Sequence, residues 1–231
     1  MRLYSIRLER EEFDRRLGGG IPHNSLVLIS GEKGSGKSII CQRLIYGFLA
    51  NDISVTYLST QYTTVEFLNQ MKSLNYKITH NLIDNSLRFV PVYPLLGDIK
   101  SREDFAERLM LAEPLFDKDI TLIDAFSSLV KYSISDASSV IELLGFFKKL
   151  IGGGKSVILT VNERDISDEL MGEIERSSTI SIGTEIKKGE EEIKRVMIIN
   201  KYGGALSDYV EITPFRVIPK VGLLVEISTI V

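Results

Sequence analysis

A phosphate-binding loop pattern is the strongest constraint in this chain. Residues 31–38 read Gly-Glu-Lys-Gly-Ser-Gly-Lys-Ser, which matches G-x-x-x-x-G-K-[ST] without deviation. The loop follows an apolar run at residues 25–30, typical of a central parallel strand, and opens a segment at residues 37–50 with helical spacing of apolar residues. Glycines let the backbone curl so that successive N–H groups point inward at phosphate oxygens. The sequence therefore predicts a site for a nucleoside triphosphate.

The residue types in the loop have distinct expected roles. We expect Lys37 to place its charge on the β- and γ-phosphates, as a catalytic residue, and Ser38 to bind Mg²⁺ through its hydroxyl group. The helix that begins at Lys37 directs the positive end of its dipole toward the same anion. The predicted nucleotide-binding residues here are Gly31, Lys33, Gly34, Ser35, Gly36, Lys37, Ser38 and Ile39.

An acidic residue on the Mg²⁺ side of such a site should end a neighbouring strand. Residues 120–124 read Ile-Thr-Leu-Ile-Asp, so Asp124 stands at the expected place. We predict that Asp124 is a catalytic residue and a Mg²⁺ ligand, directly or through a water molecule. The alternative is that Asp124 only caps the segment at residues 125–130.

The hydrophobic pattern predicts an α/β fold in which helices flank a mostly parallel sheet. Besides 25–30 and 120–124, we expect core strands at residues 53–59, 87–93 and 156–161. Pro91 places the strand at 87–93 on the sheet edge, because proline cannot donate to a ladder. Helices are expected at residues 37–50, 63–74, 101–112, 136–150 and 166–176. Beyond residue 178 we expect antiparallel hairpins, with strands at residues 179–183, 193–200, 209–213, 215–219 and 223–227. The whole chain, residues 1–231, is predicted to form one domain.

Composition narrows the functional classes. The net charge is −3, which disfavours duplex DNA as a partner because DNA affinity depends on neutralising phosphates. The single cysteine, Cys41, allows no intrachain disulfide and indicates a reducing setting. The charged N-terminal stretch is not a signal sequence, and no apolar run approaches the ~20 residues of a membrane span. We therefore expect a cytoplasmic protein.

Residues 14–38, DRRLGGGIPHNSLVLISGEKGSGKS, resemble the opening of the RecA/KaiC family of P-loop ATPases. The resemblance continues through the Asp124 strand, the strand at 157–162 and the terminal hairpins. It implies a RecA-like core that binds ATP with Mg²⁺, and a ring of subunits, typically a hexamer, with ATP at the interfaces. A polar residue at the end of the fourth strand, here Asn162, would sense the γ-phosphate. A simple turn asparagine is the alternative.

Two departures from the family pattern concern hydrolysis. KaiC-type enzymes carry paired glutamates just after the second strand, whereas this chain has Ser59, Thr60 and Gln61 there. Gln61 can orient a water molecule but cannot take its proton at neutral pH. Near the C-terminus, where the family has Lys-x-Arg-Gly, Lys201 remains but Gly203 replaces the arginine. We expect nucleotide binding with slow hydrolysis, and Lys201 is either a nucleotide ligand or a solvated charge.

Single-domain length and these departures are most similar to the branch of the family that serves the archaellum, the swimming filament of archaea. That resemblance implies an ATP-regulated component that engages the motor ATPase and scaffold proteins at the membrane base, and therefore a peripheral location through those partners. The alternatives are an active ATPase that uses Gln61 or a neighbouring subunit's group, a DNA-binding filament, and a self-phosphorylating protein with Ser59 or Thr60 as acceptor. The sequence favours neither the DNA-binding filament nor the self-phosphorylating protein.

Two further features have simpler interpretations. His23 and His80 lie too far apart in the sequence to indicate a shared metal site, so we predict no zinc. The run Glu190-Glu191-Glu192 is expected to be a solvated hairpin tip, with an acidic docking site for a basic partner as the alternative.

Overall fold

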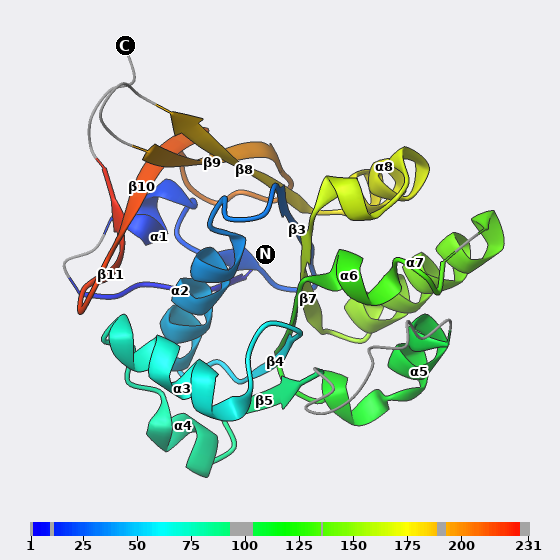
Figure 1. The fold of residues 1–231 in the computed structure, drawn as a ribbon, viewed down its shortest axis with the longest axis horizontal. Coiled ribbons are helices and arrows are strands. Elements are labelled where there is room, and N and C mark those ends of the chain that lie inside the picture. Colours follow the sequence, from blue (N-terminus) through cyan, green and yellow to red (C-terminus); the bar gives the residue numbers. More distant parts are fainter. Residues whose placement is uncertain (1, 10–11, 93–103, 135, 189–192, 227–231) are drawn as a thin grey trace.

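A nine-stranded mixed sheet organises the computed structural model (Figure 1), which describes residues 2–9, 12–92, 104–134, 136–188 and 193–226. The strand order is β11-β10-β9-β8-β3-β7-β6-β4-β5. The pairs from β8 through β3 to β5 are parallel, and the pairs from β8 to β11 are antiparallel. This arrangement confirms the predicted α/β class with an antiparallel C-terminal extension.

The central strands are buried along their whole length, as their apolar runs predict. These fully buried strands are β3 (Leu26–Gly31), β4 (Val55–Ser59), β6 (Ile120–Asp124) and β7 (Ser156–Val161). The edge strand β5 (Leu87–Pro91) is only partly buried, which confirms the edge position indicated by Pro91. The extension consists of β8 (Ile180–Lys188), β9 (Ile193–Tyr202), β10 (Ile212–Ile218) and β11 (Gly222–Val225).

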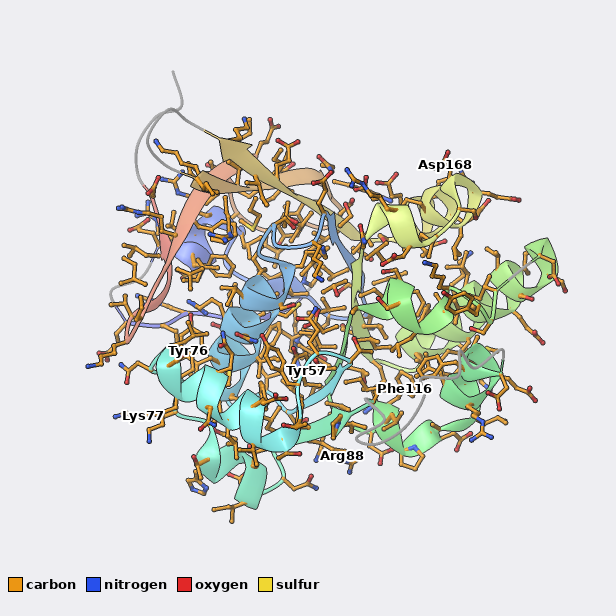
Figure 2. The ribbon with its side chains drawn as sticks, in the orientation of Figure 1. Tyr57, Tyr76, Lys77, Arg88, Phe116 and Asp168 are labelled. Carbon is orange, nitrogen blue, oxygen red and sulfur yellow. The ribbon has the colours of Figure 1, made fainter. Side chains whose placement is uncertain are left out.

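Helices cover both faces of this sheet (Figure 1). On one face, α2 (Lys37–Ala50) and α3 (Thr64–Ser73) pack against a core that includes Val27, Ile29 and Tyr57. On the other face, side chains from a second group of helices pack in the cluster that contains Leu28 and Leu159. These helices are α5 (Phe105–Leu111), α6 (Phe126–Val130), α7 (Ala137–Gly152) and α8 (Asp168–Ser177). Tyr57 lies in the interior of the molecule in Figure 2. Tyr76 lies beside the start of β11.

Small elements complete the chain. The N-terminal segment contributes β1 (Leu3–Tyr4), α1 (Phe13–Arg16) and β2 (Ile21–Pro22), and β1 pairs with β2. Beyond this N-terminal segment, four short elements were not predicted: α4 (Thr79–Ile83), α6 and two 3₁₀ turns at Glu113–Phe116 and Glu163–Asp165. These elements have at most five residues, too few for apolar periodicity to appear. The first residues of the helix expected at 101–112, with Ser101, lie outside the described residues.

One prediction for the extension is wrong. Residues 209–213 and 215–219 were expected to form two strands separated by Pro214, but β10 runs through this proline. The Pro214 carbonyl accepts the Glu226 N–H from the β11 side at 2.9 Å, so the proline nitrogen faces that side too. The β10–β11 ladder covers Phe215 to Ile218 of β10, so Pro214 lies just outside it. The missing N–H of Pro214 therefore removes no ladder hydrogen bond.

Candidate nucleotide-binding site

The loop of residues 31–38 connects β3 to α2 at the carboxyl end of the parallel strands. Its sharp path depends on glycine. Gly36, the residue before α2, has φ of +105°, and a Cβ atom there would lie 2.7 Å from the Phe215 ring. Gly31 has φ of +143°, and a Cβ atom there would lie 2.3 Å from the Thr184 carbonyl oxygen. Both positions exclude a side chain for steric reasons as well as for backbone conformation.

The antiparallel extension contacts this loop from three strands. On β8, the Thr184 hydroxyl lies 2.6 Å from that of Ser35 and donates to the Ser30 carbonyl at 2.8 Å. On β9, Arg195 Nε donates to the Gly34 carbonyl at 3.1 Å. On β10, Phe215 packs against Gly36. The Ser35 side chain is therefore buried in contacts that fix the loop, and its backbone N–H donates to Glu32 within the loop at 3.2 Å.

A cavity of about 1060 Å³ opens beside the loop and the first turn of α2. It brings together seven residues predicted from the sequence: Lys33, Gly34, Gly36, Lys37, Ser38, Ile39 and Gln61. Thr60, Thr63, Glu66, Arg195 and Val217 complete the lining. No sequence signal points to Arg195 and Val217, because only the register of the C-terminal strands brings them to the loop.

Lys37 points back along the loop that precedes it. Its ammonium group donates to the carbonyl oxygens of Gly31 at 2.6 Å and Glu32 at 2.8 Å. Burial lowers the pKa of Lys37, and the negative charge of Asp124 opposes this shift. The group is thus a partly desolvated cation next to the loop amides, the arrangement that binds phosphate.

Asp124 is buried at the end of β6, beside Ser59 of β4. Its Oδ2 atom accepts from the Tyr57 hydroxyl and its Oδ1 atom from the Thr160 hydroxyl, each at 2.8 Å. Both donors belong to neighbouring strands, and the Ala125 N–H at the start of α6 donates to Thr160 and not to Asp124, which favours the site role over the capping alternative. A carboxylate has about four acceptor positions, so each oxygen keeps one for a water or a metal. Asp124 and Ser38 therefore fit Mg²⁺, which retains several water ligands and would neutralise charge on the phosphates.

The segment after β4 lies against the start of α2. The Ser38 hydroxyl donates to Gln61 Oε1 at 3.3 Å, and the Gln61 N–H donates to the buried Ser59 hydroxyl at 3.1 Å. Thr60 also lines the cavity. Gln61 is thus next to the predicted Mg²⁺ ligand, where an amide can orient but not deprotonate a water molecule.

Glu66 is the one carboxylate among the described residues that line this cavity, and it caps the start of α3. Its Oε2 atom accepts from the Thr63 backbone N–H at 2.8 Å and from the Thr63 hydroxyl at 2.9 Å, forming a capping box at the start of α3. The hydrogen bonds from the backbone and then the side chain of Thr63 lower the pKa of Glu66. A carboxylate held in this way is a poor proton acceptor.

Asn162 and Lys201 do not line the loop cavity. Asn162 lines a separate cavity of about 450 Å³ bordered by Gly31, and its Nδ2 atom donates to Asp165 at 3.0 Å. Lys201 donates to the Arg176 carbonyl at 3.2 Å, near the C-terminus of α8. Lys201 therefore lies outside the loop cavity, whereas Asn162 lies at the edge of the loop beside Asp165, whose negative charge acts on Lys37.

The two histidines occupy unrelated places. His23 stacks on Tyr4 with ring centroids 3.7 Å apart, and His80 lies 3.3 Å from Asp84 on α4. In the described part of the chain, no helix has the length and apolar character required to cross a membrane.

The fold and the loop define a P-loop α/β protein of the RecA-like class. The family model described as "ATPase: KaiC" matches residues 9–225, so the chain belongs to the KaiC family. A structure of a KaiC-like protein from Pyrococcus horikoshii has a TM-score of 0.74 over 97% of this chain and 99% of its own, at 18% identity, which supports the shared fold.

Within that family the chain is similar along its full length to proteins named archaeal flagellar ATP-binding protein FlaH. The relative from Methanocaldococcus jannaschii is 42% identical, with 100% of this chain and 98% of the relative covered. The relative from Methanococcus voltae is 38% identical, with 100% of both chains covered. The crystal structure of the flagellar accessory protein FlaH from M. jannaschii has a TM-score of 0.92, with 98% of this chain and 100% of that chain covered.

Proposed function

We propose that this chain is an ATP-binding regulatory component of the archaellum motor complex, with weak or no ATP hydrolysis of its own. The observation that carries the proposal is the pairing of a complete phosphate loop with a cavity whose one carboxylate, among the described lining residues, is held by a helix cap. Of the described residues around the cavity, Gln61 stands beside Ser38, and Glu66 is bound by Thr63. General-base assistance is commonly worth about 10²–10⁴ in rate, so its loss separates binding from turnover.

The relatives supply the biological setting. Full-length identity of 42% to a protein named archaeal flagellar ATP-binding protein supports ATP as the nucleotide and the archaellum as the assembly. We infer that Mg²⁺ accompanies ATP, held by Ser38 and Asp124, and that the chain assembles as a ring, with six subunits typical of the family. The ring would engage the motor ATPase and scaffold proteins at the membrane base from the cytoplasmic side. No nucleic acid is needed for this role.

ATP occupancy would then act by mass action on assembly, because a ligand that binds one state preferentially stabilises that state. Lys201 does not line its own chain's loop cavity, so any contact that it makes with nucleotide would come from a neighbouring subunit, whereas Asn162 borders the loop at Gly31 within its own chain. Both residues therefore remain candidate ligands in the ring.

The experiment is sedimentation of the purified chain with Mg-ATP, with Mg-ADP and without nucleotide, beside Lys37→Ala. We expect ATP to shift the chain to a discrete larger species and the variant to remain unshifted. Identical sedimentation of the wild-type chain in all three conditions would contradict nucleotide-regulated assembly.

The second candidate is an active ATPase in which Gln61 orients the attacking water. The 3.3 Å contact between Ser38 and Gln61 favours this candidate over a DNA-binding filament or a self-phosphorylating protein, since the amide lies next to the residue that we propose to bind Mg²⁺. Steady-state turnover of several per second without any partner would support an active ATPase.

A further inference from the structure

One ion pair joins the phosphate loop to the turn that follows β7. Arg164, in the middle of the turn at Glu163–Asp165, pairs with the carboxylate of Glu32 in the loop. Both side chains are largely exposed, at 77% for Arg164 and 65% for Glu32, so the pair adds little stability by itself. Among the described residues that line the cavity of about 450 Å³ beside it, Arg164 is the one cation. The pair therefore holds a cation at the loop without locking it there.

Lys37 shows where the end of a bound triphosphate comes to lie. Its ammonium group contacts the Glu32 carbonyl oxygen at 2.8 Å, and a lysine at this place in a phosphate loop binds the β- and γ-phosphates. Those phosphates therefore lie beside the residue whose side chain holds Arg164. Burial lowers the pKa of Lys37, and the charges of Asp165 and Glu163 are close enough to oppose this shift. The turn that carries Arg164 thus borders the phosphate end of the site.

A terminal phosphate is a better partner for Arg164 than the Glu32 carboxylate. A guanidinium group can bind two phosphate oxygens at once with its planar fork of donors. A terminal phosphate group also carries more negative charge and one more acceptor oxygen than a carboxylate. A diphosphate bound at the same loop has no group at the γ-position. Arg164 is therefore placed to distinguish a triphosphate from a diphosphate.

We propose that Arg164 exchanges Glu32 for the γ-phosphate when a nucleoside triphosphate binds, and that this exchange makes the site selective for the triphosphate over the diphosphate. The inference rests on the proposed function, since it assumes that the loop holds a nucleoside triphosphate. Glu32 is then a competitor that keeps Arg164 whenever no γ-phosphate is present. The turn leads into α8 through the Ser167 cap, so the exchange couples the identity of the nucleotide to the start of that helix.

The two halves of the ion pair then have opposite effects on binding. Loss of the Arg164 guanidinium weakens triphosphate binding and spares diphosphate binding. Loss of the Glu32 charge frees Arg164 and strengthens triphosphate binding, but only while Arg164 is present. An ion pair that merely held the loop in shape would instead weaken both nucleotides when either partner is replaced.

The test is calorimetric titration of ADP and of the slowly hydrolysed analogue ATPγS, each with Mg²⁺, into the wild-type chain, Arg164→Ala, Glu32→Gln and the double variant. Arg108→Ala is the matched control, because Arg108 is an exposed arginine of α5 that pairs with Asp104 and lines neither cavity. We expect Arg164→Ala to weaken ATPγS about tenfold or more, the usual effect of losing a hydrogen bond to a charged group, and ADP less than about threefold. Glu32→Gln should strengthen ATPγS about threefold or more, and this gain should fall below about twofold in the double variant.

Retained ADP binding also shows that Arg164→Ala is folded. Equal weakening of ADP and ATPγS in Arg164→Ala would overturn the inference, because the ion pair would then only support the loop. An ATPγS affinity that is unchanged in Arg164→Ala, or not strengthened in Glu32→Gln, would overturn it while leaving the proposed function intact. An equal gain from Glu32→Gln with and without Arg164 would do the same, since removal of charge repulsion alone would explain it. A wild-type chain that binds neither nucleotide would overturn the proposed function and the inference with it.

Discussion

The Tyr57 hydroxyl donates a 2.8 Å hydrogen bond to Oδ2 of Asp124, joining β4 to the end of β6 beneath the phosphate loop. Both residues are buried, and burial followed by the negative charge of Asp124 raises the pKa of Tyr57 well above its ordinary value. Tyr57 therefore remains a donor through the neutral range. It holds the carboxylate that we assign to Mg²⁺ in one orientation, as supporting residues of metal ligands commonly do.

Replacing Tyr57 by phenylalanine should destabilise the protein by about 1–3 kcal/mol, because it removes a donor from a buried carboxylate. Urea unfolding measures the loss. Tyr46→Phe is the control, since the Tyr46 ring stacks on Tyr76 and its hydroxyl makes no hydrogen bond to a described residue. Equal free energies of unfolding for the two variants would contradict the assigned role of Tyr57.

Gly36→Ala should impair both folding and nucleotide binding. Its φ of +105° and the Phe215 ring 2.7 Å from the new Cβ make the variant strained, at a typical cost of about 1–3 kcal/mol. Gly145→Ala is the matched control, because Gly145 is helical and a Cβ there meets nothing within 4 Å. It should stabilise α7 by about 0.5–1 kcal/mol. Thermal unfolding and ATP titration of both variants test this contrast, and an unaffected Gly36→Ala would refute it.

Stability should fall in alkaline solution in part through Tyr202. Its hydroxyl donates to the carbonyl of Gly20 at 2.5 Å and lies 3.1 Å from that of Leu17, and burial raises its pKa from 10.0 to about 12. Between these values the unfolded chain releases this proton while the folded protein keeps it, so rising pH favours unfolding. Below pH 10 both states hold the proton and this dependence vanishes. Tyr202→Phe should show a shallower decline between pH 10 and 12 in urea unfolding, and an unchanged slope would argue against it.

Gln61→Glu should raise ATP turnover, because it places a carboxylate beside Ser38 where the chain has only an amide. A base there is worth up to about 10²–10⁴ in rate, and we expect at least a tenfold increase. Glu66→Gln should leave turnover unchanged, since Glu66 caps α3. A phosphate-release assay measures both variants. A large fall in Glu66→Gln would instead identify Glu66 as the base.

The loop, Asp124 and the central strands were predictable because each depends on local sequence. The glycines and Lys37 fix the loop, and a short apolar run ending in aspartate gives β6 its bounds, Ile120–Asp124. The contribution of the extension was not predictable. Arg195 reaches Gly34 only through the register of β8, β9 and β10, and a one-residue shift would turn it to the other face. The sequence also predicts a strand break at Pro214. β10 continues through this proline because the β10–β11 ladder ends at Phe215, and the local sequence does not encode where that pairing ends.

The most direct test of the central claim is steady-state ATP turnover by the purified chain, measured beside its equilibrium ATP affinity, with Lys37→Ala as control. The account predicts micromolar binding that is lost in Lys37→Ala, together with turnover far below about 1 s⁻¹, the low end of typical enzymes. Turnover of several per second that disappears in Lys37→Ala would contradict it, and the chain would then be an ATPase in its own right.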